Sequence, residues 1–140
     1  MPAPSTRPPL SSILARDAMH APVVTCDADA PLSEVARLMG HHRIHAVVVH
    51  GLTARGVGGK EDVLGVVDDL DLVRAAVTDD GTATARAMAG TEPLTVGADD
   101  DLVAVATALT AHDCAHALVV EGERPVGVIS TLDLASALAG

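Results

Sequence analysis

Hydrophobic side chains recur along the chain with two different spacings, and each spacing predicts one type of element. In residues 32–39 the apolar positions are spaced i, i+3, i+4 and i+7, as on one face of an amphipathic helix. Pro31 precedes this stripe and suits the first turn of a helix. Residues 46–49 and 117–120 are instead continuous apolar runs, which are typical of strands covered on both faces. The pattern therefore predicts a mixed α/β fold.

The predicted elements occur twice, in the same order. Residues 23–39 reappear as residues 93–109 at a constant offset of 70. Further along the chain, the runs HAVVV and VLGVVDDLDLV are echoed by HALVV and PVGVISTLDLA. Three matched blocks in one order indicate a duplicated unit. This unit is too long, and has too few copies, for a solenoid array.

Each copy is predicted to run strand, helix, strand, turn, strand, helix. The third strands and last helices are expected at Val63–Val67, Pro125–Ile129, Asp69–Val77 and Thr131–Ala139. The two copies differ in the connection before the third strand. Gly51–Asp62 contains four glycines and predicts a mobile loop, whereas Glu121–Arg124 predicts a tight hairpin.

The ends of the duplicated units follow from the same pattern. Met1–Pro9 contains four prolines and predicts a flexible tail, and Leu10–Met19 is expected to form a short helix leading into the first unit. Asp79–Gly81 is a predicted turn between the two copies. The sequence therefore divides into a tail with a lead-in helix at 1–16, a first unit at 17–78 and a second unit at 79–140.

Composition restricts the class of partner. The 140 residues are 49% hydrophobic and include no Phe, Tyr or Trp, so the core is built from aliphatic side chains. The formal net charge of −10 argues against a nucleic acid or an anionic membrane surface as partner. No secretory signal or membrane-spanning stretch is apparent, which predicts a soluble cytoplasmic protein. The two cysteines fit no metal or redox spacing, and we expect reduced thiols.

The junctions between the third strand and the last helix are the best candidates for chemistry. The second unit reads GVISTLD, ending at Asp133, and the first reads GVVDDLD, ending at Asp71. One interpretation is purely structural, since Ser130 and Asp133 have the spacing of a helix capping box and Asp68 is a good N-cap. The other is a ligand site. A helix N-terminus and a serine hydroxyl suit a phosphate, and an aspartate accepts hydrogen bonds from ribose hydroxyls.

The duplication, the H-A-[VL]-V-V strand and the G-h-h-[ST]-x-x-D junction together resemble a tandem pair of cystathionine-β-synthase-type (CBS) domains, a Bateman module, over Asp17–Gly140. The resemblance implies an α/β (α+β) fold in which two β-α-β-β-α units pack with pseudo-twofold symmetry. It also implies a cleft between the units for an adenosine-containing ligand such as AMP, ADP, ATP or S-adenosylmethionine. A homodimer is implied as well.

The resemblance also implies site residues. The ribose-binding aspartates fall on Asp133 and Asp71, and the remaining ligand-binding candidates are Ser130, Val128 and His116 in the second unit and Val23, Thr25, Ile44 and His45 in the first. Asp68 stands where the family has Ser or Thr, so a phosphate would be repelled from the Asp71 site. The lack of an arginine close before the second strand of the second unit favours AMP or an adenosyl thioether over a triphosphate.

Two functions therefore remain open. The first is a regulatory sensor that binds an adenosine-containing ligand and signals to an unidentified partner protein by a conformational change. On this interpretation Asp133→Ala abolishes binding with little loss of fold. The alternative is a ligand-free structural module for homodimerisation or protein interaction. We expect no enzyme and no metal site, because the histidines at 41, 42, 45 and 50 lack completing ligands and no nucleophile has a readable partner.

Overall fold

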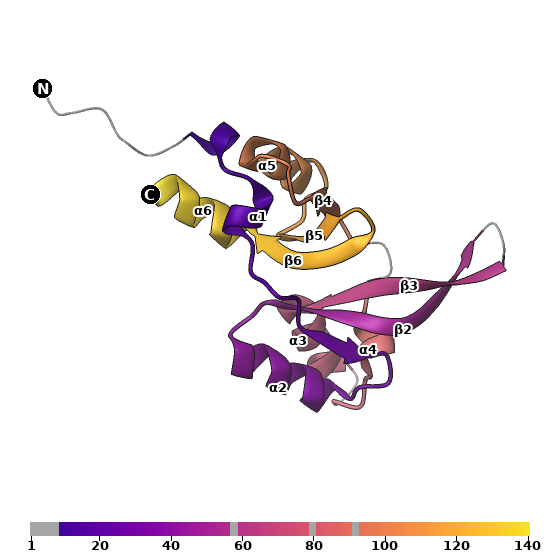
Figure 1. Cartoon of the computed structure of the whole chain (residues 1–140). Coiled ribbons are helices and arrows are strands. Elements are labelled where there is room, and N and C mark those ends of the chain that lie inside the picture. The colour runs from indigo at the N-terminus through magenta and orange to yellow at the C-terminus, as the bar shows by residue number, and fades with distance from the viewer. Residues whose placement is uncertain (1–8, 57–58, 79–80, 91–92) are drawn as a thin grey trace, which may run out of the picture. The chain divides into compact units, whose positions relative to one another are not determined.

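The computed structural model describes residues 9–56, 59–78, 81–90 and 93–140 (Figure 1). The chain forms two compact units. Val23–Pro93 forms the first of them, called here the middle unit. The second, called the terminal unit, combines the chain up to Pro22 with Leu94–Gly140. Each unit contains one three-stranded sheet and helices, so the predicted α/β class is confirmed.

The middle unit begins with a strand and ends with a short helix. Its elements are β1 (Thr25–Asp27), α2 (Leu32–His42), β2 (Ala46–Gly56), β3 (Gly59–Asp68), α3 (Asp69–Thr78) and α4 (Ala85–Met88). The sheet order is β1-β2-β3, with β1 parallel to β2 and β2 antiparallel to β3. Helix residue Val35 packs in one core with strand residues Val47, Val49 and Val67, and all four are fully buried.

The terminal unit repeats this topology with its own core. Its elements are η1 (Leu10–Ser12), α1 (Ala15–Ala18), β4 (Thr95–Gly97), α5 (Leu102–Ala111), β5 (His116–Glu121), β6 (Arg124–Ser130) and α6 (Thr131–Ala139). The sheet order is β4-β5-β6, with the same parallel and antiparallel pairings. Leu102, Val105, Val119 and Ile129 are fully buried in its core. The predicted helical stripe of the second copy is therefore the face of α5 that the core buries.

Each unit is completed by a short helix from the chain segment that precedes the other unit's first strand. In the terminal unit, the Ala15 amide donates to the Asp100 carbonyl over 2.7 Å. In the middle unit, the Ala85 amide donates to the Ala30 carbonyl over 2.8 Å. The offset of 70 residues thus extends to this segment. The single helix expected at Leu10–Met19 is wrong, because a 3-10 turn and a four-residue helix separated by extended backbone occupy that range.

The glycine-rich connection of the first copy, predicted to be a mobile loop, forms paired strands in the structure. Strands β2 and β3 continue as an antiparallel hairpin as far as the Gly56–Gly59 pair, while residues 57–58 lie outside the described residues. Gly51 has a φ of 86°, and a β-bulge interrupts the register between Val49 and Leu52. The glycine therefore permits a bulge within the ladder, and the strand resumes after it.

Strand register shows how the two copies align. Thr25 pairs with Val48 and Thr95 pairs with Leu118, so both strands keep the offset of 70. The matching letters HAVVV and HALVV have an offset of 71 and are therefore one residue out of structural register. Because successive strand residues face opposite sides of a sheet, the histidines of these two runs occupy non-equivalent positions.

Two predictions fall on residues that the structure leaves undescribed. The expected flexible tail, Met1–Pro9, lies outside the described residues except for Pro9. In the expected turn at 79–81 only Gly81 is described, and it has a φ of 80°. In the described parts of the chain, no helix combines the length and the apolar character that crossing a bilayer requires.

Candidate functional site

The strand–helix junction of the terminal unit is a closed capping box. The Ser130 amide donates to Asp133 Oδ2 over 2.8 Å, and Ser130 Oγ accepts from the Asp133 amide over 3.3 Å. The Ser130 hydroxyl lies a further 3.1 Å from Asp133 Oδ2. Ser130 is buried, with 7% of its surface exposed. The capping box predicted at this junction is therefore confirmed, and it leaves Asp133 Oδ1 outside the box.

A residue that the sequence analysis missed contacts this second carboxylate oxygen. His20 Nε2 lies 2.8 Å from Asp133 Oδ1. The His20 backbone exchanges two hydrogen bonds with Val128 of β6, over 2.9 and 3.0 Å, which fixes its position beside the junction. The side chain of Asp133 is only 9% exposed, whereas that of His20 is 65% exposed. The segment after α1 thus brings a histidine onto the candidate ribose-binding carboxylate.

A glycine in β6 makes this approach possible. A Cβ atom built on Gly127 would lie 2.8 Å from the His20 carbonyl oxygen and would also meet the Met19 side chain. In the middle unit, a Cβ on Gly65 would lie 3.0 Å from the Gly90 carbonyl oxygen. In each case the close neighbour of the glycine is another segment of the same unit.

The junction of the middle unit has the same shape but a different charge. Asp68 Oδ1 accepts from the Asp71 amide over 2.7 Å, and Asp71 Oδ2 accepts from the Asp68 amide over 3.0 Å. Burial raises the pKa of Asp71, the hydrogen bond from the Asp68 amide lowers it, and the charge of Asp68 raises it again, with Arg74 as a smaller lowering influence. Two carboxylates thus share one capping box. The middle unit has Gly90 where the terminal unit has His20. Gly90 pairs with Val66 in the same way that His20 pairs with Val128.

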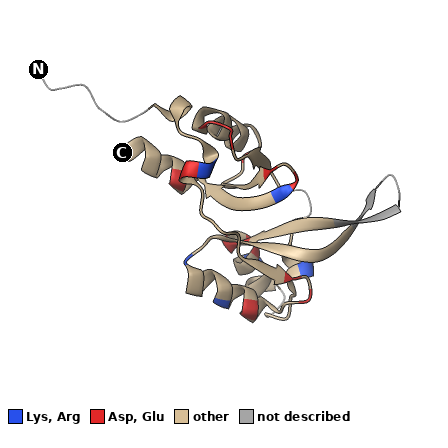
Figure 2. Ribbon diagram, in the orientation of Figure 1, with Lys and Arg blue, Asp and Glu red and all other residues tan. Residues whose placement is uncertain are grey.

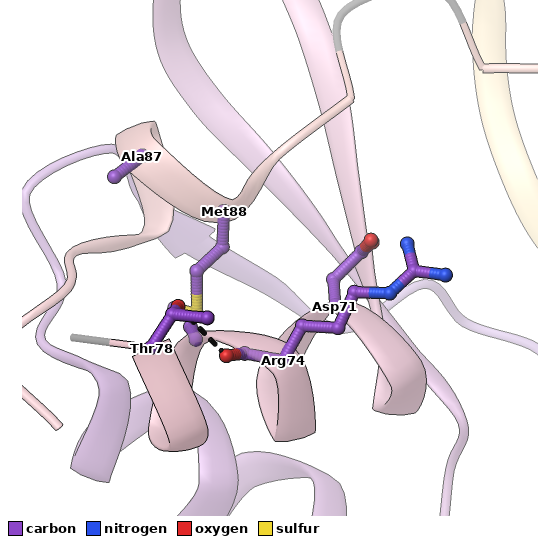
Figure 3. Close-up of a pocket in the computed structure, with 6 residues that line it drawn as sticks. Asp71, Arg74, Thr78, Ala87 and Met88 are labelled. Atoms are coloured by element: carbon purple, nitrogen blue, oxygen red, sulfur yellow. Dashed lines mark hydrogen bonds between the residues drawn. The ribbon is translucent and has the colours of Figure 1, made fainter. Parts of the chain in front are cut away.

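A small hollow lies beside Asp71 in the middle unit. It is lined by residues of α3 and α4, and Figure 3 shows Asp71 and Arg74 at one end and Met88 and Ala87 at the other. Beside the hollow, Thr78 Oγ1 donates to the Arg74 carbonyl over 2.8 Å. Its volume is about 200 Å³. Ligand pockets typically have about 300–1,000 Å³, so this hollow is too small to enclose a nucleoside by itself.

The remaining predicted site residues divide between the units. Ser130, Asp133, Val128 and His116 belong to the terminal unit, whereas Val23, Thr25, Ile44, His45 and Asp71 belong to the middle unit. Strand pairing sets His116 opposite Ser130, so the structure brings these two residues together. His45 lies before β2, and its Nδ1 is 3.1 Å from Asp69 Oδ2 at the start of α3.

Acidic residues lie at the start of the helix that follows each junction, and two described arginines pair with carboxylates of their own units. The first turns of α3 and α6 contain Asp69, Asp71 and Asp133, and acidic residues are coloured red on the ribbon in Figure 2. Arg16 is held by Asp99 over 2.7 Å and by Glu121 over 3.3 Å. Arg86, its counterpart 70 residues later, pairs with Asp29 over 3.1 Å. These two arginines are therefore engaged within their own units and are poorly placed to neutralise a polyphosphate.

Histidines and cysteines form no cluster of chemical interest in the part of the chain that the structure describes. Among those residues, no group of three or more His, Cys, Asp or Glu side chains could hold a metal ion. The rings of His41 and His42 contact each other edge to face. His50 Nδ1 lies 3.8 Å from Asp27 Oδ2. Cys26 and Cys114 are free thiols, as expected.

The family of the chain follows from these repeated units. A model of the CBS domain matches residues 15–78 and again residues 85–140. The chain belongs to the CBS domain family. The two matches start 70 residues apart, at Ala15 and Ala85, which are the alanines that begin the two short helices. The tandem CBS pair predicted from the sequence is confirmed.

Solved structures of CBS proteins share this fold. The CBS domain protein PAE2072 from Pyrobaculum aerophilum, complexed with AMP, is 28% identical, with a TM-score of 0.70 over 91% of this chain and 100% of that one. The CBS domain pair of protein MJ0100, in complex with 5′-methylthioadenosine and S-adenosyl-L-methionine, is 20% identical, with a TM-score of 0.75 over 91% and 96%. Hypoxic Response Protein I, with two coordinated zinc ions, is 25% identical, with a TM-score of 0.66 over 88% and 97%. No curated protein matches the chain.

Proposed function

We propose that this CBS protein is a regulatory module that binds an adenosine-containing ligand at the Ser130/Asp133 junction. The observation that carries the proposal is the geometry of Asp133, a nearly buried carboxylate at a helix start, held in place by Ser130 with its Oδ1 atom outside the capping box. A carboxylate oxygen in this position suits the hydroxyls of a ribose. The AMP complex of the 28% identical protein PAE2072 supports this ligand class.

The charge at the two junctions favours the terminal unit as the binding site. Ser130 offers a neutral hydroxyl, whereas Asp68 offers a carboxylate to the same region of the ligand. A phosphate placed beside Asp68 and Asp71 would meet two negative charges with Arg74 as the nearby opposing one. We therefore propose that the Asp71 site is impaired for nucleotides or takes an uncharged adenosyl ligand.

The same argument limits the charge of the ligand. The capping box already uses the Ser130 and Asp133 amides, and the Thr131 amide donates to the Ala115 carbonyl over 2.9 Å. Because these amides are already used and Arg16 is held by Asp99 and Glu121, AMP or an adenosyl thioether fits better than ATP. We propose that His116 and Val128 of the same unit contact the ligand beside Ser130.

A specific observation also favours the second candidate function, a structural module for homodimerisation. Helices α3 and α6 expose large apolar side chains, with Val73 and Val77 58% and 77% exposed on α3 and Leu132 and Leu138 60% and 56% exposed on α6. Exposed apolar side chains grouped on helices are typical of protein–protein contact surfaces. Signalling to a partner and self-association are both compatible with this feature.

A thermal-shift titration distinguishes the two functions. Wild type, Asp133→Asn and Asp71→Asn are melted with AMP, ADP, ATP and S-adenosylmethionine, because a ligand that binds only the folded state raises the melting temperature. We expect AMP to stabilise the wild type and Asp71→Asn but not Asp133→Asn. The asparagine keeps an acceptor for the capping box, so the variant should stay folded. If no ligand shifts the wild type, the homodimerisation module becomes the better account.

A further inference from the structure

The terminal unit holds a histidine against the carboxylate that the proposed ligand needs. His20 Nε2 lies 2.8 Å from Asp133 Oδ1, the carboxylate oxygen outside the capping box. The other oxygen, Oδ2, is already an acceptor for the Ser130 amide. A ribose hydroxyl that donates to Asp133 would therefore meet an oxygen that His20 already occupies.

We propose that His20 is a selectivity residue that competes with the ligand for Asp133 and sets the affinity of this site. The inference rests on the proposed function of the Ser130/Asp133 junction. Only a ligand whose ribose hydroxyls compensate for the lost His20 hydrogen bond would bind tightly. Ligands that lack a ribose diol would be rejected, because displacing the imidazole would leave the nearly buried Asp133 carboxylate without that partner.

Burial makes this competition physically reasonable. The Asp133 side chain is 9% exposed and anchored by the capping box, so it is the fixed partner. The His20 side chain is 65% exposed, so its ring can rotate into solvent with little loss of packing. The His20 backbone stays paired with Val128 in either case. Displacement therefore requires a side-chain rotation and no rearrangement of the fold.

The middle unit supplies a natural control. Gly90 occupies the position of His20, paired with Val66 in the way that His20 is paired with Val128. A Cβ atom on Gly90 would meet nothing within 4 Å, so a side chain can begin there without a clash at Cβ. The variant His20→Gly therefore gives the terminal unit the residue found in the middle unit. The double variant His20→Gly/Gly90→His moves the histidine to the other unit without changing composition or charge.

The test measures AMP binding to the full chain by isothermal titration calorimetry. Loss of one competing hydrogen bond corresponds to a change of about five- to tenfold in affinity. We expect His20→Gly and the double variant each to bind AMP about five- to tenfold more tightly than the wild type. Gly90→His alone should leave the affinity for AMP unchanged. In the wild type, AMP should shift the nuclear magnetic resonance signals of the His20 ring, and we expect Asp133→Asn to shift them without ligand.

The outcomes separate the two proposals. If His20→Gly binds AMP with the wild-type affinity or more weakly, the competition by His20 is refuted while ligand binding at this junction stands. The same conclusion follows if AMP leaves the His20 ring signals unchanged. If neither the wild type nor His20→Gly binds AMP, or if Asp133→Asn binds it normally, the proposed function itself fails at this junction. Denaturant unfolding of each variant shows whether any change in affinity reflects a damaged fold.

Discussion

Removal of the Asp133 carboxylate tests how strongly the candidate site supports the fold. From the sequence alone, Asp133→Ala is expected to abolish ligand binding with little loss of fold. The structure changes the second half of that expectation. Asp133 accepts from the Ser130 amide over 2.8 Å and from the His20 ring over 2.8 Å, and its Oδ2 lies 3.1 Å from the Ser130 hydroxyl.

The size of the effect follows from these contacts. Loss of a helix-capping side chain costs about 0.5–2 kcal/mol. The Ser130 amide, whose residue is only 7% exposed, would also lose its acceptor, and an unsatisfied buried donor costs about 1–3 kcal/mol. The pair with His20 adds at most about 1 kcal/mol, because the imidazole is largely exposed. These terms overlap, and we expect Asp133→Ala to lower the free energy of unfolding by about 2 kcal/mol.

Urea unfolding followed by circular dichroism measures this change directly. For a chain of this size, about 2 kcal/mol corresponds to a fall of roughly 6–10 °C in melting temperature. Asp133→Asn should lose less than half as much, since it keeps an acceptor for the Ser130 amide. Asp101→Ala is the matched control, because Asp101 caps α5 through one hydrogen bond of 2.9 Å to the Ala104 amide. An Asp133→Ala variant within about 0.5 kcal/mol of the wild type would refute the reasoning.

Three further predictions concern other residues. Gly127→Ala should destabilise the fold by about 1–3 kcal/mol in urea unfolding, because its Cβ would collide with the segment that crosses β6; an unchanged midpoint would contradict the close approach. Folding raises the pKa of Asp71 above its ordinary 3.8, so the folded state binds this proton more tightly than the unfolded chain does. The resulting stabilisation is present below the ordinary pKa and is lost as the pH rises through the higher pKa of the folded state. Asp68→Ser removes one cause of the shift and should therefore stabilise the protein at about pH 7 but not at about pH 3, as unfolding at both pH values would show. Burial raises the pKa of the Cys26 thiol, so iodoacetamide should modify Cys114 first; equal rates by mass spectrometry would argue otherwise.

Local pattern was enough to predict most elements and the core of each unit. Helix α2 and strand β6 are close to their predicted ranges because their patterns reflect contacts within one segment. The capping box at Ser130 could be read from two residues three apart, since both partners belong to one helix turn. The division into residues 1–16, 17–78 and 79–140 remains a prediction.

The β2–β3 hairpin shows where local signals misled. Its glycines predicted a loop, but pairing with an adjacent strand provides hydrogen bonds that a single-chain pattern does not reveal. The letter match HAVVV and HALVV misled for a similar reason. Register is decided by which residues pair across strands, and the pairing keeps an offset of 70.

The sequence by itself determined the duplicated unit, its α/β class and the two junctions with their aspartates, because these depend on spacing within short segments. Only the tertiary structure decided which unit accepts each short helix. The dipeptide Ala-Arg occurs at Ala15-Arg16 and again at Ala85-Arg86, so the sequence indicates that the short helix is repeated at the offset of 70. Without the packing, neither dipeptide shows which unit's core its helix joins. The consequence is the contact of His20 with Asp133, two residues 113 positions apart. Such long-range contacts depend on how buried surfaces assemble, which local spacing does not specify.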